Sequence, residues 1–216
     1  MKYSLDETDR NILDKLISEA EEKTNAQIVL ATIRRCDNYS EVPWKAFAIG
    51  SSLSCLVIFL LDLLIFRWIT GQAMLLSVAA ILITGAVFSL LTVFLPCFAG
   101  LFISGSRMET ETYQYAESLF LSRELYATEG RRGILLLVSQ FEKKVVVLPD
   151  RGAKSYLDDE TMKRIISKMI PDLRKNKISN ALETGLNEIV KALCPPLPKG
   201  KAINELSNEI IEEEGA

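Results

Sequence analysis

The sequence predicts an α/β fold: a small mixed sheet of three to four strands flanked by helices, with an inserted two-helix transmembrane hairpin. Two observations support this fold class. Apolar stretches fill most of the segment 46–104, whereas the rest of the chain is polar enough to be soluble. Outside that segment the pattern is helix, strand, helix, strand, strand, helix, helix, which is typical of α/β domains. Neither flank holds enough strand for a stable sheet, so we expect residues 1–45 and 105–194 to form one domain.

The N-terminal flank is predicted to contain a helix followed by a buried strand. Ser4 and Glu7 have the spacing of a capping box, and Thr24 with Asn25 is expected to end the helix. The run 26–33 is rich in β-branched residues and predicts a strand. The apolar stripe of the helix comprises Ile12, Leu13, Leu16, Ile17 and Ala20.

The hairpin is predicted from two long apolar runs, at about 46–66 and 73–95. Each run is long enough to cross a hydrocarbon core of roughly 30 Å as a helix. A soluble chain of 216 residues can rarely cover helices that are apolar on all sides, which favours a membrane over a soluble core. Because Pro96 disfavours helix at the preceding residue, we expect the second crossing to end near Leu95. Residues 96–103 extend it, either crossing the membrane or lying along it.

The charges beside the hairpin predict its orientation. Arg34, Arg35 and Lys45 precede the first crossing and Arg107 follows the second, whereas the connection between them has only Arg67. The positive-inside rule therefore predicts a multi-pass protein of the inner (cytoplasmic) membrane with both termini in the cytoplasm.

The second flank is predicted to complete the sheet. A helix at 110–126 is followed by a polar turn and two apolar runs, 133–140 and 145–150, which read as a β-hairpin. Asp158 or Asp159 is placed to cap the next helix, which Pro171 is expected to interrupt.

The last predicted helix spans about 179–193, and residues 195–216 are expected to form an acidic tail. The Glu-rich run 205–214 is interpreted as a solvated helix or tail. An alternative is a peptide that docks on a partner, since Leu206, Ile210 and Ile211 give it an apolar side.

Several positions, taken in order, resemble the TPM-domain family, specifically its bacterial membrane-associated members of unknown function. They are Thr24, Gln27-Ile28-Val29, Ala116, Phe120, Thr128, Gly133-Ile134-Leu135, Asp150, Gly152, Asn204-Glu205-Leu206 and Glu209-Ile210. The resemblance implies an α/β sandwich, often attached to membranes. It also implies roles known among relatives: photosystem repair, receptor assembly or acid phosphatase activity, with loop carboxylates that bind divalent cations in some. This chain departs from the family pattern at Gln27, where relatives have Glu, and at Arg132, where they have Asn.

Composition excludes several kinds of chemistry. The chain contains no histidine, and its four cysteines form no CxxC pair, so Ser-His and Cys-His catalysis and a zinc knuckle are excluded. The sequence also lacks a Cys-x5-Arg loop, a DxDx[TV] motif and a GxxxxGK[ST] loop. A net charge of −3 predicts no nucleic-acid partner.

Two groups of polar residues remain as candidate sites. Loop carboxylates could hold Mg²⁺ or Ca²⁺, or could instead cap a helix, form a turn and be solvated; they are Asp37, Asp150, Asp158 and Asp159. Arg131 and Arg132 could bind a phosphate or a lipid headgroup, or could lie in a solvated turn. No other cofactor is implied.

The sequence therefore leaves two functions open. One is a non-catalytic module, tethered to the lipid bilayer, that assists assembly or quality control of another membrane protein. The alternative is a divalent-cation-dependent phosphatase. The missing nucleophile and the lack of histidine favour the first.

Overall fold

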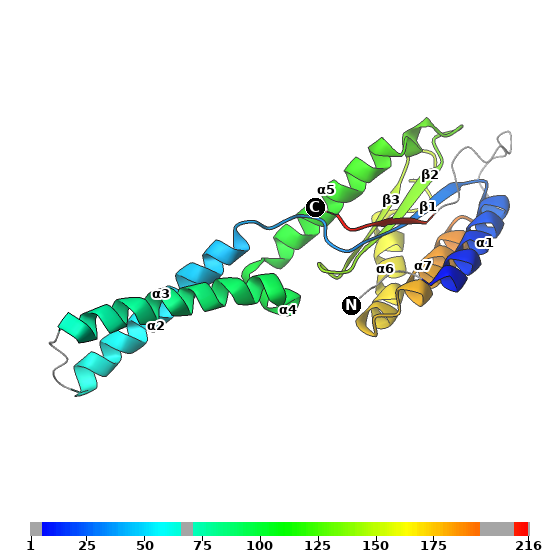
Figure 1. The fold of residues 1–216 in the computed structure, drawn as a ribbon. Helices are drawn as coiled ribbons and strands as arrows, with labels where there is room; N and C mark the ends of the chain where they lie inside the picture. Colours follow the sequence, from blue (N-terminus) through cyan, green and yellow to red (C-terminus); the bar gives the residue numbers. More distant parts are fainter. Residues whose placement is uncertain (1–5, 66–70, 195–209, 216) are drawn as a thin grey trace. The chain divides into compact units, whose positions relative to one another are not determined.

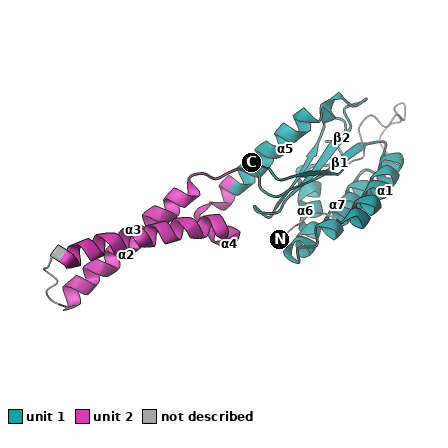
Figure 2. Cartoon of the chain, viewed as in Figure 1, with its two compact units in different colours: residues 1–37, 108–216 teal, residues 38–107 magenta. Residues whose placement is uncertain are grey.

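The computed structural model describes residues 6–65, 71–194 and 210–215. The chain divides into two compact units, one of residues 1–37 and 108–216 and the other of residues 38–107 (Figure 2). The boundary at residue 107 lies within helix α5 (Gly105–Ser122).

A four-stranded mixed sheet forms the centre of the first unit, in the order β3-β2-β1-β4 (Figure 1). The strands are β1 (Gln27–Ile33), β2 (Gly133–Ser139), β3 (Lys144–Pro149) and β4 (Ile211–Glu213). β1 runs parallel to both β2 and β4, and β2 pairs antiparallel with β3. The predicted α/β fold with a small mixed sheet is confirmed, and the sheet joins strands from both sides of the hairpin.

The alternation of side chains along β2 produces two cores. Ile134, Leu136 and Val138 belong to one core, and Leu135 and Leu137 belong to the other. Successive residues of a strand point to opposite faces, so a strand buried on both faces is apolar throughout. Every residue of β2 is buried.

Four helices cover the two faces. Helices α1 (Glu7–Thr24), α6 (Asp159–Arg174) and α7 (Ile178–Ala192) cover one face, and α5 covers the other (Figure 1). Helix α1 ends as predicted, with Asn25 in the left-handed conformation and its N–H bonded to the Glu21 carbonyl. Its N-cap is Asp6, whose carboxylate accepts the Glu7 N–H, rather than Ser4, which lies outside the described residues.

Three further expectations need correction. Helix α5 starts five residues earlier and ends four earlier than the predicted 110–126, with the short 3₁₀ helix η2 (Leu125–Ala127) after it. Pro171 does not interrupt α6, because it lies in the last turn and removes only one backbone hydrogen bond there. Residues 211–213 are neither a helix nor a free tail but the edge strand β4, since β1 offers them an unpaired edge.

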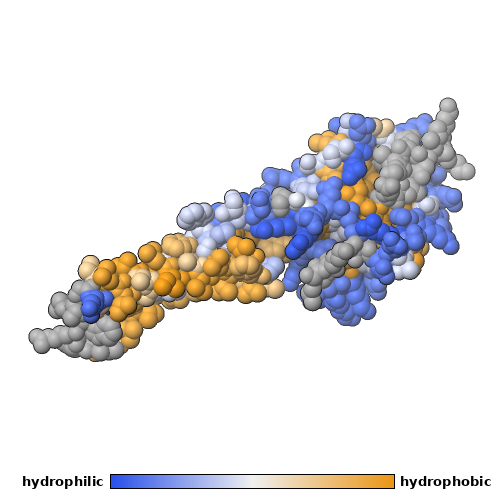
Figure 3. Space-filling model, in the orientation of Figure 1, coloured by the Kyte–Doolittle hydropathy of each residue, from blue (hydrophilic) through white to orange (hydrophobic). Residues whose placement is uncertain are grey.

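The second unit contains two long helices, α2 (Val42–Ile65) and α3 (Gly71–Phe94). Two 23-residue spans, Val42–Leu64 and Gln72–Phe94, are long and apolar enough to cross a membrane, and little of either is buried. Exposed apolar residues accordingly make up much of the face of this unit that Figure 3 shows. The helices pack closely where a Cβ on Gly50 would lie 2.8 Å from the Phe88 ring. As predicted, the second helix ends just before Leu95, and α4 (Pro96–Ala99) and the 3₁₀ helix η1 (Gly100–Phe102) follow.

Candidate functional site

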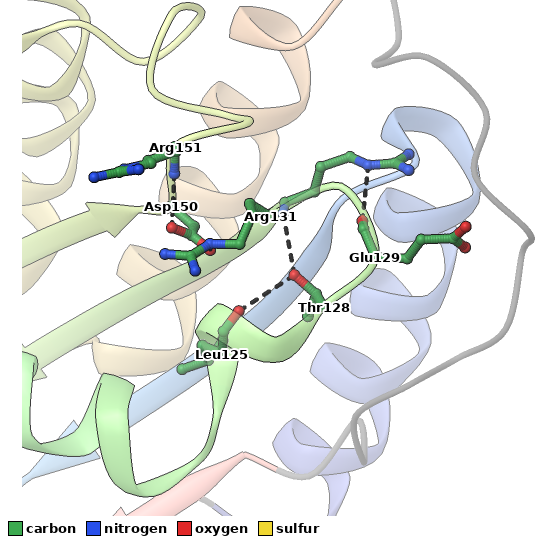
Figure 4. A network of polar contacts seen from close by, with 7 residues as sticks. Leu125, Thr128, Glu129, Arg131, Asp150 and Arg151 are labelled. Atoms are coloured by element: carbon green, nitrogen blue, oxygen red, sulfur yellow. Dashed lines mark hydrogen bonds and ion pairs between the residues drawn. The ribbon is translucent and has the colours of Figure 1, made fainter.

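Asp150 lies at the end of the sheet where β2 begins and β3 finishes. Its side chain is 5% exposed, and Arg131 Nε lies 2.8 Å from its Oδ2 (Figure 4). The N–H direction does not satisfy hydrogen-bond geometry, so this contact is an ion pair. The other oxygen, Oδ1, accepts the Arg151 N–H at 2.7 Å. A buried carboxylate is therefore paired with a guanidinium whose side chain is half exposed.

The backbone around Asp150 joins two loops. The Asp150 N–H donates to the Gly133 carbonyl at 2.8 Å, and the Gly152 N–H donates to the Arg131 carbonyl at 2.8 Å. Arg131 has φ of 55°, a left-handed conformation that costs a side chain about 1 kcal/mol or more. A Cβ on Gly152 would lie 2.7 Å from the Arg131 carbonyl oxygen and closer still to that of Gly130. Glycine at position 152 is thus required by close packing of the two loops.

Arg132 is directed away from this ion pair. Its Nε donates to the Glu129 carbonyl at 3.1 Å, and its Nη1 donates to the Asn25 carbonyl at 3.3 Å. Its backbone N–H donates to the Thr128 hydroxyl oxygen at 3.0 Å, which closes the turn. The two adjacent arginines therefore stabilise different parts of the loop and do not point at a common position.

A second buried carboxylate, Glu142, lies at the opposite end of the sheet and is 3% exposed. Its Oε1 accepts the Cys36 N–H at 3.0 Å, and its Oε2 accepts a short hydrogen bond from the Ser139 hydroxyl. Burial raises the pKa of the Cys36 thiol to about 11, so the thiol remains protonated near neutral pH. This cluster bonds β1 to the β2–β3 turn. The sequence analysis missed it, although a Ser and a Glu three residues apart in a predicted hairpin turn were the available signal.

The predicted carboxylate set is divided between these two ends. Asp37 lies four positions after the last residue of β1, whereas Asp150 is bonded to Gly133, which pairs with the first residue of β1. A seven-residue strand is roughly 20 Å long, so Asp37 and Asp150 are far apart. Within residues 6–65, 71–194 and 210–215, no three carboxylate or cysteine side chains come together as metal ligands.

Asp158 and Asp159 lie at the start of α6. Asp158 is the N-cap, and its Oδ1 accepts the Thr161 N–H at 2.9 Å. A hydrogen bond with the Thr161 side chain, and after it the bond from the Thr161 N–H, lowers the pKa of the Asp158 carboxyl group. Asp159 is the first residue of the helix and is exposed. A negative charge at this position also interacts favourably with the helix dipole.

A third carboxylate with a distinct environment is Glu21, near the end of α1. Its Oε1 accepts the Ile28 N–H at 2.9 Å. Burial raises the pKa of Glu21 to about 7, so this group titrates near neutral pH.

Comparisons with known proteins agree with this fold. Residues 103–192 match the family model of the TPM domain. The NMR structure of the BA42 protein from the psychrophilic bacterium Bizionia argentinensis superposes with a TM-score of 0.58 at 14% sequence identity, covering 98% of this chain and 97% of that chain. At this identity the similarity shows the fold alone. No curated protein matches the chain. The resemblance inferred from the sequence is confirmed over the part of the chain that the family model matches, residues 103–192.

Proposed function

We propose that this chain is an integral membrane protein whose TPM domain is a non-catalytic binding module that assists assembly or quality control of other membrane proteins. The observation that carries the proposal is the state of Asp150 and its neighbours. Asp150 is held by Arg131 and by the Arg151 N–H, and Asp158 caps a helix. These carboxylates therefore stabilise the loop and the helix that contain them.

Membrane placement is supported by the second unit. Its two candidate spans are almost wholly exposed, and apolar side chains at that density need either lipid or another protein to cover them. A 23-residue helix is about 35 Å long, which is enough for one crossing. The cation bias described above supports an orientation with both termini in the cytoplasm.

A labelling experiment tests this topology. In a variant whose four native cysteines are replaced by serine, a single cysteine is placed at Gly71 or at Lys201. A membrane-impermeant maleimide applied to intact cells should label the Gly71 position and spare the Lys201 position. Labelling at Lys201 without permeabilisation would contradict the proposed orientation.

The alternative is a phosphatase, because the matching family model carries the word phosphatase in its name and because Arg131 lies beside Asp150. A hydrolase needs charge stabilisation at the phosphate and an activated nucleophile. Here the guanidinium of Arg131 already faces a buried anion at 2.8 Å, so phosphate binding would have to compete with Asp150.

Purified full-length protein in detergent distinguishes the two functions. We expect no Mg²⁺- or Ca²⁺-dependent turnover of p-nitrophenyl phosphate above background, and no change in rate for Asp150→Asn combined with Asp159→Asn. We also expect other membrane proteins to co-purify with the tagged full chain but not with a tagged segment of residues 38–107. Turnover that the double substitution abolishes would establish the phosphatase instead.

A further inference from the structure

The edge strand β4 binds to β1 as an extended peptide would. Residues 31–33 of β1 pair in parallel with Ile211–Glu213, and the Arg34 N–H donates to the Glu213 carbonyl at 3.1 Å. An unpaired strand edge offers a row of N–H and C=O groups that any extended segment of matching side chains can use. Backbone pairing thus supplies general affinity on this edge, and specificity must come from the side chains.

The side chains of this segment contact alternate faces of the sheet. Ile210 packs against the core under α1, α6 and α7, and Ile211 packs against the core under α5. Glu212 then forms two contacts with Arg10 of α1, at 2.7 and 3.2 Å. Glu213 accepts a short hydrogen bond from the Tyr115 hydroxyl of α5. The site therefore selects two apolar residues followed by two acidic residues.

The donors on α5 are suited to a carboxylate. Arg123 Nη2 lies 3.4 Å from Glu213 Oε1 and supplies a positive charge beside the Tyr115 hydroxyl. Burial and the neighbouring Glu213 raise the pKa of the Tyr115 phenol, which keeps it protonated as a donor. With Arg10 on α1, each face of the sheet thus provides a cationic contact for one acidic side chain.

Residues 210–213 are nevertheless held by weak contacts that a competing segment could replace. The strand is three residues long, and the side chains of Arg10 and Arg123 are 44% and 51% exposed. Exposed ion pairs of this kind contribute roughly 0.2–1 kcal/mol each. A longer segment with the same pattern could pair with more of β1 and make the same ionic contacts, so it could compete with the chain's own residues.

We propose that the outer edge of β1, with Arg10, Tyr115 and Arg123, is a docking site for an extended acidic segment of a partner protein. The segment has two apolar residues followed by two acidic residues, and residues 210–213 of this chain are the resident occupant that it displaces. This deepens the binding role proposed above and rests on it, because it names the surface and the chemistry of the partner.

A peptide titration tests the site. The probe is a fluorescein-labelled peptide with the sequence of residues 204–216, and the protein is the full chain in detergent or a variant that ends at residue 209. We expect fluorescence anisotropy to show binding to the truncated variant at least tenfold tighter than to the full chain. Peptides carrying Glu212→Lys with Glu213→Lys should not bind.

Glu214→Lys in the peptide is the matched control, because Glu214 is exposed and forms no hydrogen bond or ion pair described in the structure. It should leave affinity within twofold. Tyr115→Phe in the truncated protein should weaken binding about tenfold or more, since one hydrogen bond to a charged group is lost. Equal binding of the Glu212→Lys, Glu213→Lys peptide would overturn the assigned specificity.

Should truncation unfold the domain, a full-length variant with Glu212→Lys and Glu213→Lys replaces it as the peptide acceptor. If that variant also fails to fold, β4 is a permanent structural strand and the proposal is wrong. If the full chain has twice the mass of one copy and truncation halves that mass, the site binds a second copy of this chain. That result would overturn the proposal. If the truncated variant still captures partner proteins but does not bind the peptide, this surface is not the docking site. The binding role proposed above would then still stand.

Discussion

Two carboxylates are buried at opposite ends of the same sheet, and they are stabilised differently. Asp150 is 6% exposed and is paired with the half-exposed cation Arg131. Glu142 is 3% exposed and accepts hydrogen bonds from the Cys36 N–H and the Ser139 hydroxyl, which are neutral donors. The cation that pairs with Asp150 can therefore move into water, whereas Glu142 is held by one backbone donor and one side-chain donor, both uncharged.

The strongest test of this difference is Glu142→Leu. The substitution leaves the Cys36 N–H and the Ser139 hydroxyl buried without an acceptor, and each orphaned donor costs about 1–3 kcal/mol. We expect a loss of about 3–4 kcal/mol in the free energy of unfolding, read from urea-dependent pulse proteolysis in detergent. Glu142→Gln keeps one acceptor oxygen, so it should lose about 1 kcal/mol. Equal losses for the two variants would show that the hydrogen bonds are not what stabilises this end.

Gly152→Ala probes the packing of the loops at the Asp150 end. The added Cβ would lie against the Gly130 and Arg131 carbonyl oxygens, which are backbone atoms and cannot rotate away. Overpacking of this kind costs about 1–3 kcal/mol, and we expect the upper part of that range. The same proteolysis assay measures it. Gly105→Ala is the matched control, because a Cβ there meets nothing within 4 Å, and it should have no destabilising effect.

The ion pair at Asp150 should respond asymmetrically to substitution. Arg131→Gln leaves a buried carboxylate without its cation and should cost about 2 kcal/mol. Asp150→Asn leaves an exposed guanidinium that water solvates, and its amide oxygen still accepts the Arg151 N–H, so it should cost about 1 kcal/mol. A double-mutant cycle measures the coupling. Equal effects of the two substitutions would mean that Asp150 is not effectively desolvated.

Glu21 sharpens the comparison as a partly buried acid that forms no ion pair with the described residues and accepts the Ile28 N–H instead. Its folded-state pKa of about 7 exceeds the ordinary value of 4.5, so the folded protein binds the proton more tightly than the unfolded chain. Its stabilising contribution is present below about pH 4.5 and is lost as pH rises to about 7. We expect Glu21→Gln to be more stable than the native protein by about 1 kcal/mol at pH 8, allowing for partial exposure, and equal to it at pH 4.5. A pH-independent difference would contradict this assignment.

The sequence predicted the elements that have a strong local pattern. The runs that form β1, β2 and β3 were found because they are apolar and β-branched, and α3 was ended correctly by Pro96. β4 was missed because two of its three residues are glutamates, whose pairing with Arg10 and Tyr115 arises only in the folded domain. A sequence pattern identifies a strand by the apolar residues that it buries, and β4 is only partly buried.

The candidate site was less predictable than the fold. Asp37 and Asp150 both follow strands, so the sequence grouped them, but β3 runs antiparallel to β2 and ends beside its first residue. Glu142 was overlooked because a glutamate in a turn is normally exposed, whereas here it is buried and bonded to Cys36, 106 positions away. The burial of a charged side chain depends on distant partners, which composition and periodicity do not report.

The position of β1 in the sheet has a consequence for synthesis of the protein. β1 is made before residues 38–107, whereas both of its neighbours in the sheet, β2 and β4 (Ile211–Glu213), are made after them. Contacts between residues so distant in sequence close slowly, because the chain must first bring them together. During translation β1 therefore has neither of its neighbours in the sheet until β2 has been made, and the sheet can be completed only after residues 211–213 have left the ribosome. In that interval the strand edge is open to chaperones and proteases.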